Sequence, residues 1–106
     1  MNTAQHRFKS GFGQCECLWC GRRRSLDDCK VTADMRTALK AWHFVYGWLW
    51  KAKLNHAWQT GDYGIIAERH VQPLQLLRNT IGPRGLAKIT TRLVEDYTPP
   101  KTEVQP

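Results

Sequence analysis

The strongest periodic pattern in this chain is a set of apolar residues at helical spacing between positions 33 and 59. Thr32 can cap a helix that begins at Ala33, and Asp34 lies in the first turn, where the helix dipole favours a negative charge. The pattern predicts a helix from Ala33 to about Gln59, ending at Thr60-Gly61-Asp62, which is about 40 Å long if it is continuous. The face predicted to enter the core consists of Met35, Leu39, Trp42, Val45 or Tyr46, and Leu49.

The middle of this helix, residues 41–50, is apolar on nearly every face. A helix of that kind is normally enclosed on several sides, so the pattern places it at the axis of the fold. Ten residues are too few to span a bilayer, and lysines bracket the run, so no transmembrane segment is expected. Trp48 and Trp50 fall off the core face and are predicted to point elsewhere. They can stack on unpaired bases, but helical tryptophans more often fill a core or a subunit interface, which favours dimerisation.

Three shorter helices are predicted after the long one. The first covers Tyr63 to Val71, and the second begins at Pro73, which suits a first helical position, and ends at Gly82-Pro83. The third runs from about Arg84 to Tyr97. The core residues predicted for these helices are Ile65, Ile66, Val71, Leu74, Leu77, Ile81, Leu86, Ile89, Leu93 and Tyr97.

All four cysteines of the chain fall in one short window, spaced Cys-x-Cys-x2-Cys-x8-Cys: Cys15, Cys17, Cys20 and Cys29. Four thiolates brought together by so little backbone can saturate a tetrahedral Zn²⁺, and a closed shell of four sulfurs leaves no position for water or substrate. The segment Cys17-Leu18-Trp19-Cys20-Gly21 resembles the knuckle of zinc ribbons and treble-clef fingers, in which a glycine lets the chain turn and aim its amides at the sulfurs. The sequence therefore predicts a structural zinc site with these four cysteines as ligands, or with His6 in place of Cys15.

Three other uses of the cysteines compete with zinc. Disulfides fit an even count, but the polar N-terminus resembles no signal peptide, which favours a reducing cytoplasm. An iron–sulfur cluster also takes four cysteines, although this spacing differs from the ferredoxin patterns. Free thiols would be an unusual use of so tight a cluster.

The chain is strongly basic for its length of 106 residues, with 16 Lys and Arg against 9 Asp and Glu and a formal net charge of +7. A balance of this kind favours an anionic partner, most often nucleic acid. The positive charge is concentrated in the first part of the chain, since residues 1–31 carry six basic and three acidic side chains, whereas residues 61–98 nearly balance.

Two groups of basic residues are candidates for nucleic-acid contacts. Arg22, Arg23 and Arg24 directly follow the predicted knuckle, where a metal-held loop can present them to phosphates, and the alternative is a solvated charge run. Arg84, Lys88 and Arg92 share the side of the third short helix opposite its core residues. The two helices around Gly82-Pro83 can form a helix-turn-helix with Arg84, Lys88 and Thr91 on its reading face, or an ordinary helical hairpin.

Catalytic motifs are absent from the sequence. The two serines lie outside any nucleophile elbow, there is no glycine-rich phosphate loop, and the four histidines, His6, His43, His56 and His70, are scattered. We therefore expect a non-enzymatic protein with no catalytic residues.

The sequence as a whole predicts a mostly α single domain over residues 1–106. Residues 1–10 are expected to be flexible, 11–31 to form the four-cysteine zinc module, 32–97 to form the helical core on which the module packs, and 98–106 to be a disordered tail. The predicted function is a cytoplasmic, zinc-stabilised, nucleic-acid-binding regulator, for DNA or RNA, with no membrane partner. The alternative is a small protein-binding adaptor or inhibitor, of a kind encoded by phages or mobile elements, with the aromatic helix as its interface.

Overall fold

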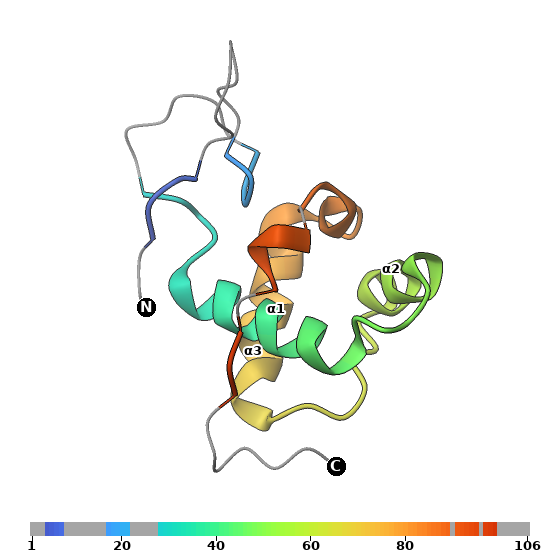
Figure 1. Cartoon of the computed structure of the whole chain (residues 1–106). Helices are drawn as coiled ribbons and strands as arrows, with labels where there is room; N and C mark the ends of the chain where they lie inside the picture. The colour runs from blue at the N-terminus through green and yellow to red at the C-terminus, as the bar shows by residue number, and fades with distance from the viewer. Residues whose placement is uncertain (1–3, 8–16, 22–27, 90, 96, 100–106) are drawn as a thin grey trace.

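The computed structural model of the chain describes residues 4–7, 17–21, 28–89, 91–95 and 97–99. Within these residues there is no sheet, and the elements are three α-helices and two 3-10 turns: α1 (Ala33–Tyr46), α2 (Lys51–Thr60), α3 (Glu68–Ile81), η1 (Gly85–Lys88) and η2 (Thr91–Leu93). Helix α1 packs across α3, α2 follows the C-terminal end of α1, and the N-terminal segments lie at the other end of α1 (Figure 1). The predicted mostly α class is confirmed.

Helix α1 begins as its sequence predicts. The Thr32 hydroxyl accepts a hydrogen bond from the Met35 amide at 3.4 Å, so one of the N–H groups that the helix itself leaves unpaired is satisfied. Met35, Leu39 and Trp42 are buried, as the spacing predicts. None of the described helices is long and apolar enough to cross a bilayer.

The prediction of one continuous helix to Gln59 is wrong, because the chain turns between Tyr46 and Lys51. Residues 42 and 58 would lie about 24 Å apart along a continuous helix at 1.5 Å per residue. In the folded chain the rings of Trp42 and Trp58 are 5.9 Å apart and both are buried. The bend is therefore what brings the second tryptophan into the core. Gly47 suits the bend, since a Cβ there would lie 2.5 Å from the carbonyl oxygen of His43.

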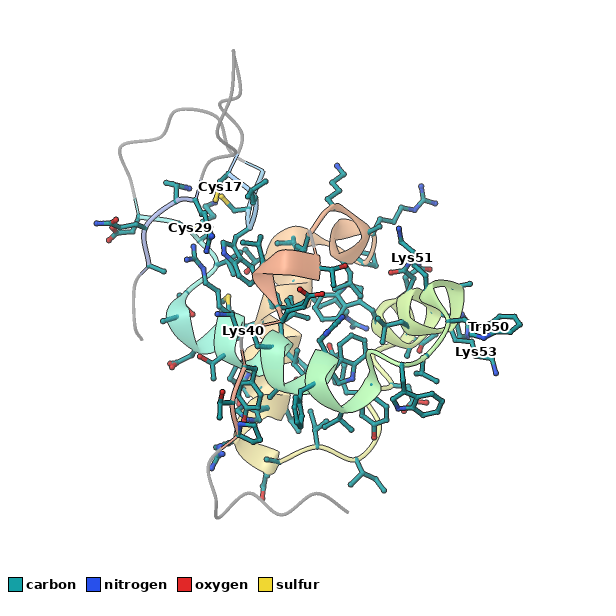
Figure 2. All side chains as sticks on the ribbon, in the orientation of Figure 1. Cys17, Cys29, Lys40, Trp50, Lys51 and Lys53 are labelled. Atoms are coloured by element: carbon teal, nitrogen blue, oxygen red, sulfur yellow. The ribbon has the colours of Figure 1, made fainter. Side chains whose placement is uncertain are left out.

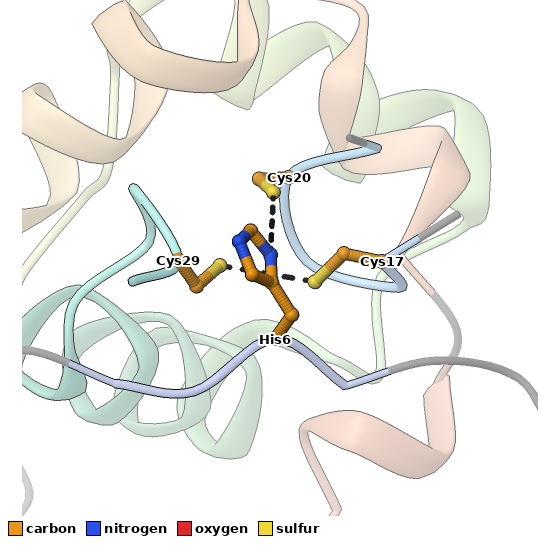
Figure 3. Close-up of side chains that lie close together, drawn as sticks. All are labelled: His6, Cys17, Cys20 and Cys29. Carbon is orange, nitrogen blue, oxygen red and sulfur yellow. Dashed lines mark hydrogen bonds between the residues drawn. The ribbon is translucent and has the colours of Figure 1, made fainter. Parts of the chain in front are cut away.

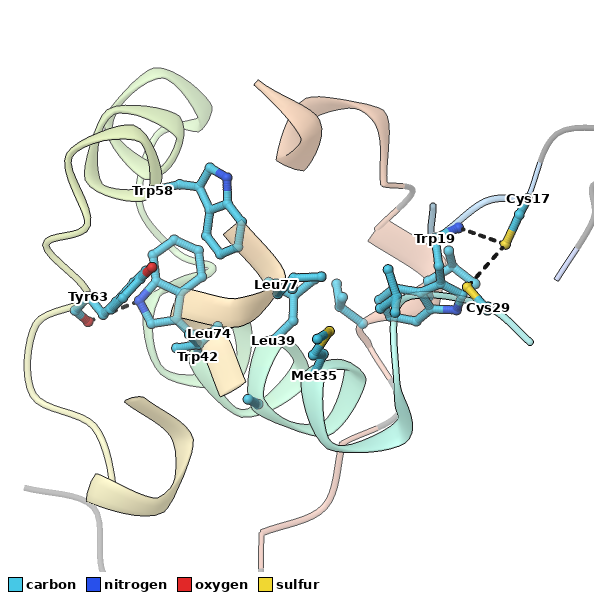
Figure 4. Close-up of a cluster of buried hydrophobic side chains, with 14 residues drawn as sticks. Cys17, Trp19, Cys29, Met35, Leu39, Trp42, Trp58, Tyr63, Leu74 and Leu77 are labelled. Atoms are coloured by element: carbon cyan, nitrogen blue, oxygen red, sulfur yellow. Dashed lines mark hydrogen bonds between the residues drawn. The ribbon is translucent and has the colours of Figure 1, made fainter. Parts of the chain in front are cut away.

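The core is built around three aromatic side chains. The rings of Trp42, Trp58 and Tyr63 lie about 6 Å from one another, at 5.9 to 6.1 Å, and the Trp42 indole N–H donates to the Tyr63 carbonyl at 2.9 Å. Leu74 and Leu77 of α3 close this cluster and are fully buried, as predicted (Figure 4). The same buried cluster continues through Leu39 and Met35 to the N-terminal residues, so the module around the cysteines shares the helical core.

The segment after α2 differs from the predicted helix over 63–71. Helix α2 ends at Thr60 with Gly61 in the left-handed region at φ 76°, which agrees with the predicted stop. Residues 62–67 are not helical, and Ile65 is 68% exposed. Its amide donates to the Tyr46 hydroxyl at 2.6 Å, and that hydroxyl donates to its carbonyl at 3.1 Å. Long-range pairing with α1 thus holds this segment in a non-helical conformation.

Two further boundary predictions are wrong. Helix α3 begins at Glu68 and contains Pro73 in its interior, where the ring has no N–H for the Arg69 carbonyl, instead of beginning at the proline. The predicted helix over 84–97 is replaced by η1 and η2. Residues three apart also share a side in a 3-10 turn, so Leu86 and Ile89 still pack against the core. A helix-turn-helix needs an α-helix here, and the described residues 85–88 and 91–93 form 3-10 turns instead, so they do not support that motif.

Candidate metal centre

Three cysteines and one histidine converge beside the start of α1. His6, Cys17, Cys20 and Cys29 each offer one ligand atom, and these four atoms all lie within 4.8 Å of one another. Figure 3 shows the side chains directed toward a common point from three separate segments. The three described thiols are free, so the competing disulfide interpretation is not supported for Cys17, Cys20 and Cys29.

The spacing of the ligand atoms fits a tetrahedral zinc ion. With Zn–S of about 2.3 Å and Zn–N of about 2.0 to 2.1 Å, a tetrahedron has S···S edges of about 3.8 Å and S···N edges of about 3.6 Å. The sulfurs of Cys17 and Cys29 are 3.8 Å apart, and Cys20 Sγ is 3.4 Å from Nδ1 of His6. Three sulfurs and one imidazole nitrogen make one of the standard structural zinc ligand sets.

Backbone pairing over long sequence distances places His6 in this cluster. The Cys29 amide donates to the Ala4 carbonyl at 2.8 Å in an isolated antiparallel bridge, and the Leu18 amide donates to the Arg7 carbonyl at 2.7 Å. The short segment 4–7 is thus held between the two ligand-bearing segments. His6 lies between its two anchored ends and so faces the sulfurs.

The knuckle predicted at 17–21 is present. Gly21 adopts φ 75°, a conformation that favours glycine, and its amide closes the turn on the Cys17 carbonyl at 2.9 Å. The amides of Arg7 and Trp19 donate to Cys17 Sγ at 3.3 and 3.4 Å. Amides directed at the sulfur are the arrangement expected around a metal-bound thiolate.

The cysteines differ in how readily they ionise. Burial raises the pKa of the Cys17 thiol, but the backbone N–H groups of Cys20, Arg7 and Trp19 stabilise its thiolate and bring the pKa down to about 6. Burial raises the pKa of the Cys29 thiol to about 11, and the neighbouring Cys17 charge acts in the same direction. A bound divalent cation supplies the positive charge that lets both sulfurs ionise together.

Arg36 of α1 joins the candidate metal centre to the helical core. Its guanidinium donates to the Gln5 carbonyl at 2.8 Å and to the Val31 carbonyl at 3.1 Å. The same group lies over the Trp19 ring, 5.0 Å from the ring centroid. One side chain therefore contacts the histidine-bearing segment, the knuckle and the segment after Cys29.

The described ligand set agrees with one of the two alternatives drawn from the sequence. Cys17, Cys20 and Cys29 come together as predicted, and His6 supplies a fourth ligand atom. Cys15 lies outside the described residues. The sequence spacing alone cannot decide between His6 and Cys15 as the fourth ligand, because the histidine reaches the site through backbone pairing with two distant segments.

The predicted nucleic-acid residues are placed only in part. Arg22, Arg23 and Arg24 lie outside the described residues, as does the side chain of Arg92. Arg84 and Lys88 are exposed at η1, and Lys51 and Lys53, which follow the apolar run 41–50, are exposed at α2. The described residues form no ion pair with these four cations.

A cleft lies between the α1–α2 bend and the 3-10 turns. Its volume is about 550 Å³, and Lys51 and Lys88 line it from opposite elements together with the apolar side chains of Leu49 and Leu86. Glu95 is the one carboxylate among its described lining residues. The cleft therefore brings two cations from α2 and η1 to one surface.

Comparison of the chain with protein-family models, curated proteins and solved structures gives no match.

Proposed function

We propose that the chain is a non-enzymatic, zinc-stabilised, basic protein that binds nucleic acid as a regulator. Zinc occupies the centre formed by His6, Cys17, Cys20 and Cys29 in this proposal. Its role is structural, because four protein ligands complete a tetrahedral shell and leave no position for a substrate.

The observation that carries the nucleic-acid part is the cationic surface between α2 and η1. Lys51 and Lys88 line one cleft and are exposed without described ion pairs, in a chain of net charge +7. Phosphate groups are the common biological anions that such a surface attracts, and the field of the whole chain steers them toward it. Arg22, Arg23 and Arg24 add three positive charges in the sequence between Cys20 and Cys29, two of the candidate metal ligands.

Salt dependence tests this proposal. Binding of a fluorescent oligonucleotide should weaken log-linearly with salt, with a slope of about −0.7 per bound phosphate for a single strand or about −0.9 for duplex DNA. Changing Lys51 and Lys88 together to Gln should reduce the magnitude of the slope by about one unit for each phosphate that is no longer bound, as should changing Arg22, Arg23 and Arg24 to Ala.

Arg69→Gln is the control for loss of a positive charge outside the cleft, since Arg69 is exposed at the start of α3, and its unfolding curve shows whether loss of its own contacts affects the fold. Affinity that is indifferent to salt, or absent for every oligonucleotide, would refute the proposal. Salt-indifferent capture of a protein would instead identify the adaptor function that the sequence leaves as the alternative.

A further inference from the structure

The bend between α1 and α2 exposes two tryptophans. Trp48 is 76% exposed and Trp50 is 79% exposed, whereas Trp19, Trp42 and Trp58 are buried. Large aromatic side chains dominate cores and interfaces because each buries so much apolar area. The exposure of two tryptophans only two positions apart therefore needs a physical reason.

The local conformation separates these tryptophans from the core. Gly47, Leu49 and Lys51 line the cleft, while the alternate residues Trp48 and Trp50 lie outside it. Figure 2 shows Trp50 projecting away from the molecule beside Lys53, whereas Lys51 extends from the other side of α2, where it lines the cleft. We call Trp48, Trp50 and Lys53 the tryptophan–lysine patch.

Electrostatics at the patch favour an anion. Helix α2 begins at Lys51 with no side-chain cap, no acidic residue in its first turn and two lysines there. The positive end of a helix dipole is normally matched by acidic residues, so two cations at this end leave a positive potential unbalanced. A partner of net negative charge balances this positive potential when it binds.

We infer that the tryptophan–lysine patch binds unpaired bases of single-stranded nucleic acid. The indoles of Trp48 and Trp50 stack on bases, and Lys53 contacts a neighbouring phosphate, while Lys51 adds positive potential at the start of α2. This combination of aromatic platforms and a cationic track is how proteins hold single strands without reading their sequence. The inference rests on the proposed function and narrows it to unpaired strands.

Charge complementarity selects this occupant over a second copy of the chain. Each chain carries a net charge of +7, and a symmetric contact through the patch would bring the lysines of two copies together. Phosphates neutralise the same lysines. A duplex is also disfavoured as the main ligand, because its bases are already stacked on one another and offer no free face to indoles.

The experiment measures fluorescence anisotropy with labelled oligothymidylate and oligouridylate of about 12 nucleotides, a length within the site sizes of single-strand binders, and with a duplex of equal length. The zinc-loaded full chain should bind the single strands more tightly than the duplex. Trp48→Ala and Trp50→Ala should each weaken single-strand binding by about 5- to 150-fold and leave duplex binding unchanged. The comparison of the two single strands shows whether DNA or RNA is the preferred source.

Two control variants test whether the loss of affinity comes from lost stacking rather than from removal of any exposed apolar side chain. Trp50→Phe keeps a stacking ring and should lose much less affinity than Trp50→Ala. Ile65→Ala removes another exposed apolar side chain, 68% exposed and outside the patch, and should change nothing. Zinc content and the circular dichroism of all variants should match the parent, because both tryptophans are on the surface.

The remaining outcomes separate the two proposals. Equal binding of single strand and duplex, unaffected by the tryptophan variants, would overturn this inference and leave nucleic-acid binding intact. No binding of any oligonucleotide would overturn both. Tryptophan-dependent binding to vesicles of phosphatidylcholine and phosphatidylserine, or tryptophan-dependent dimerisation, with no oligonucleotide bound, would assign the patch to a membrane surface or a second copy.

Discussion

His6 and Cys15 are the two residues that distinguish the possible forms of the metal centre. Both precede the knuckle in the sequence, and either can complete a tetrahedral set with Cys17, Cys20 and Cys29. The structure places a His6 ring nitrogen 3.4 Å from Cys20 Sγ, which favours three cysteines and one histidine. A ligand set of this kind carries one negative charge less than a four-cysteine set.

Single substitutions distinguish the two forms. Changing a residue that only supports a metal ligand typically weakens metal affinity by roughly 10- to 100-fold. His6→Ala should weaken zinc affinity by more than this, because it removes a ligand itself. Cys15→Ser should leave affinity and stoichiometry unchanged. Competition with a chromophoric zinc chelator measures the zinc affinity and the zinc stoichiometry of each variant. The reverse ranking would restore the four-cysteine site.

His43 is the residue through which acidity should weaken the helical core. Burial lowers the pKa of its imidazole below 6.5, although the nearby Glu95 charge acts in the opposite direction. The unfolded chain therefore binds the proton more tightly than the folded chain does. The free energy of unfolding is therefore unaffected by titration of His43 above about pH 6.5. It decreases as the pH falls from there toward the lower pKa of the folded state.

This effect is measured as a difference between variants. Urea unfolding of the wild type and of His43→Gln, both zinc-loaded, should show the wild type losing stability relative to the variant as the pH falls below about 6.5. The metal centre is the same in both proteins, so its own acid sensitivity cancels. Parallel stability curves would mean that the ring remains accessible to water.

At the scale of elements, the sequence predicts the helix ends that local caps determine, but it predicts neither how the helices join nor where α3 begins. Thr32 and Gly61 act through neighbouring backbone groups, so their effects can be inferred from the sequence, and both boundaries are confirmed. The bend after Tyr46 depends on the packing of Trp42 against Trp58, which is a tertiary interaction. The knuckle is local and can be predicted, whereas the position of His6 is not local and the sequence leaves it open.

Arg36 is the link between elements that is easiest to test. Arg36→Met keeps much of the apolar stem and removes the hydrogen bonds to Gln5 and Val31, which should cost about 1 to 3 kcal/mol of stability. The histidine-bearing segment would be held less firmly, so zinc affinity should fall by about 10- to 100-fold. Chemical denaturation and chelator competition check the two effects.

Thr37→Ala is the control, because Thr37 is exposed on the next position of the same helix. A loss in Arg36→Met that Thr37→Ala reproduces would indicate a general effect on α1. No loss of zinc affinity would mean that the backbone hydrogen bonds of Ala4 and Arg7 position His6 without help from the helix.

At the scale of the molecule, the candidate metal centre and the helices share one buried cluster, and we expect them to depend on each other unequally, with the helices remaining folded when the metal is lost. Trp19 and Val31 reach the core from the N-terminal segments, while Trp42, Trp58 and Leu77 pack among the helices. Zinc binding in small modules contributes about 10 to 16 kcal/mol, and an entire domain is stable by about 5 to 15 kcal/mol. Among the described residues before α1, Trp19 and Val31 are the large apolar side chains in the shared buried cluster, so we expect the metal to supply most of the stability of these segments.

Removing the metal, or changing Cys20 to Ala, should therefore unfold the chain in part. Helical circular dichroism should be largely kept, because the α1–α3 packing contains no metal ligand, while protease should cut residues 11–31 rapidly. Binding through Arg22 to Arg24 should be lost, and binding through Trp48 and Trp50 should persist, because the bend lies at the opposite end of α1 from the metal centre (Figure 1).

Re-adding zinc should reverse the effects of chelation but not those of Cys20→Ala. Complete loss of helicity would show that the helices fold only on the metal-bound module, and unchanged protease resistance with full metal content in Cys20→Ala would exclude Cys20 as a ligand.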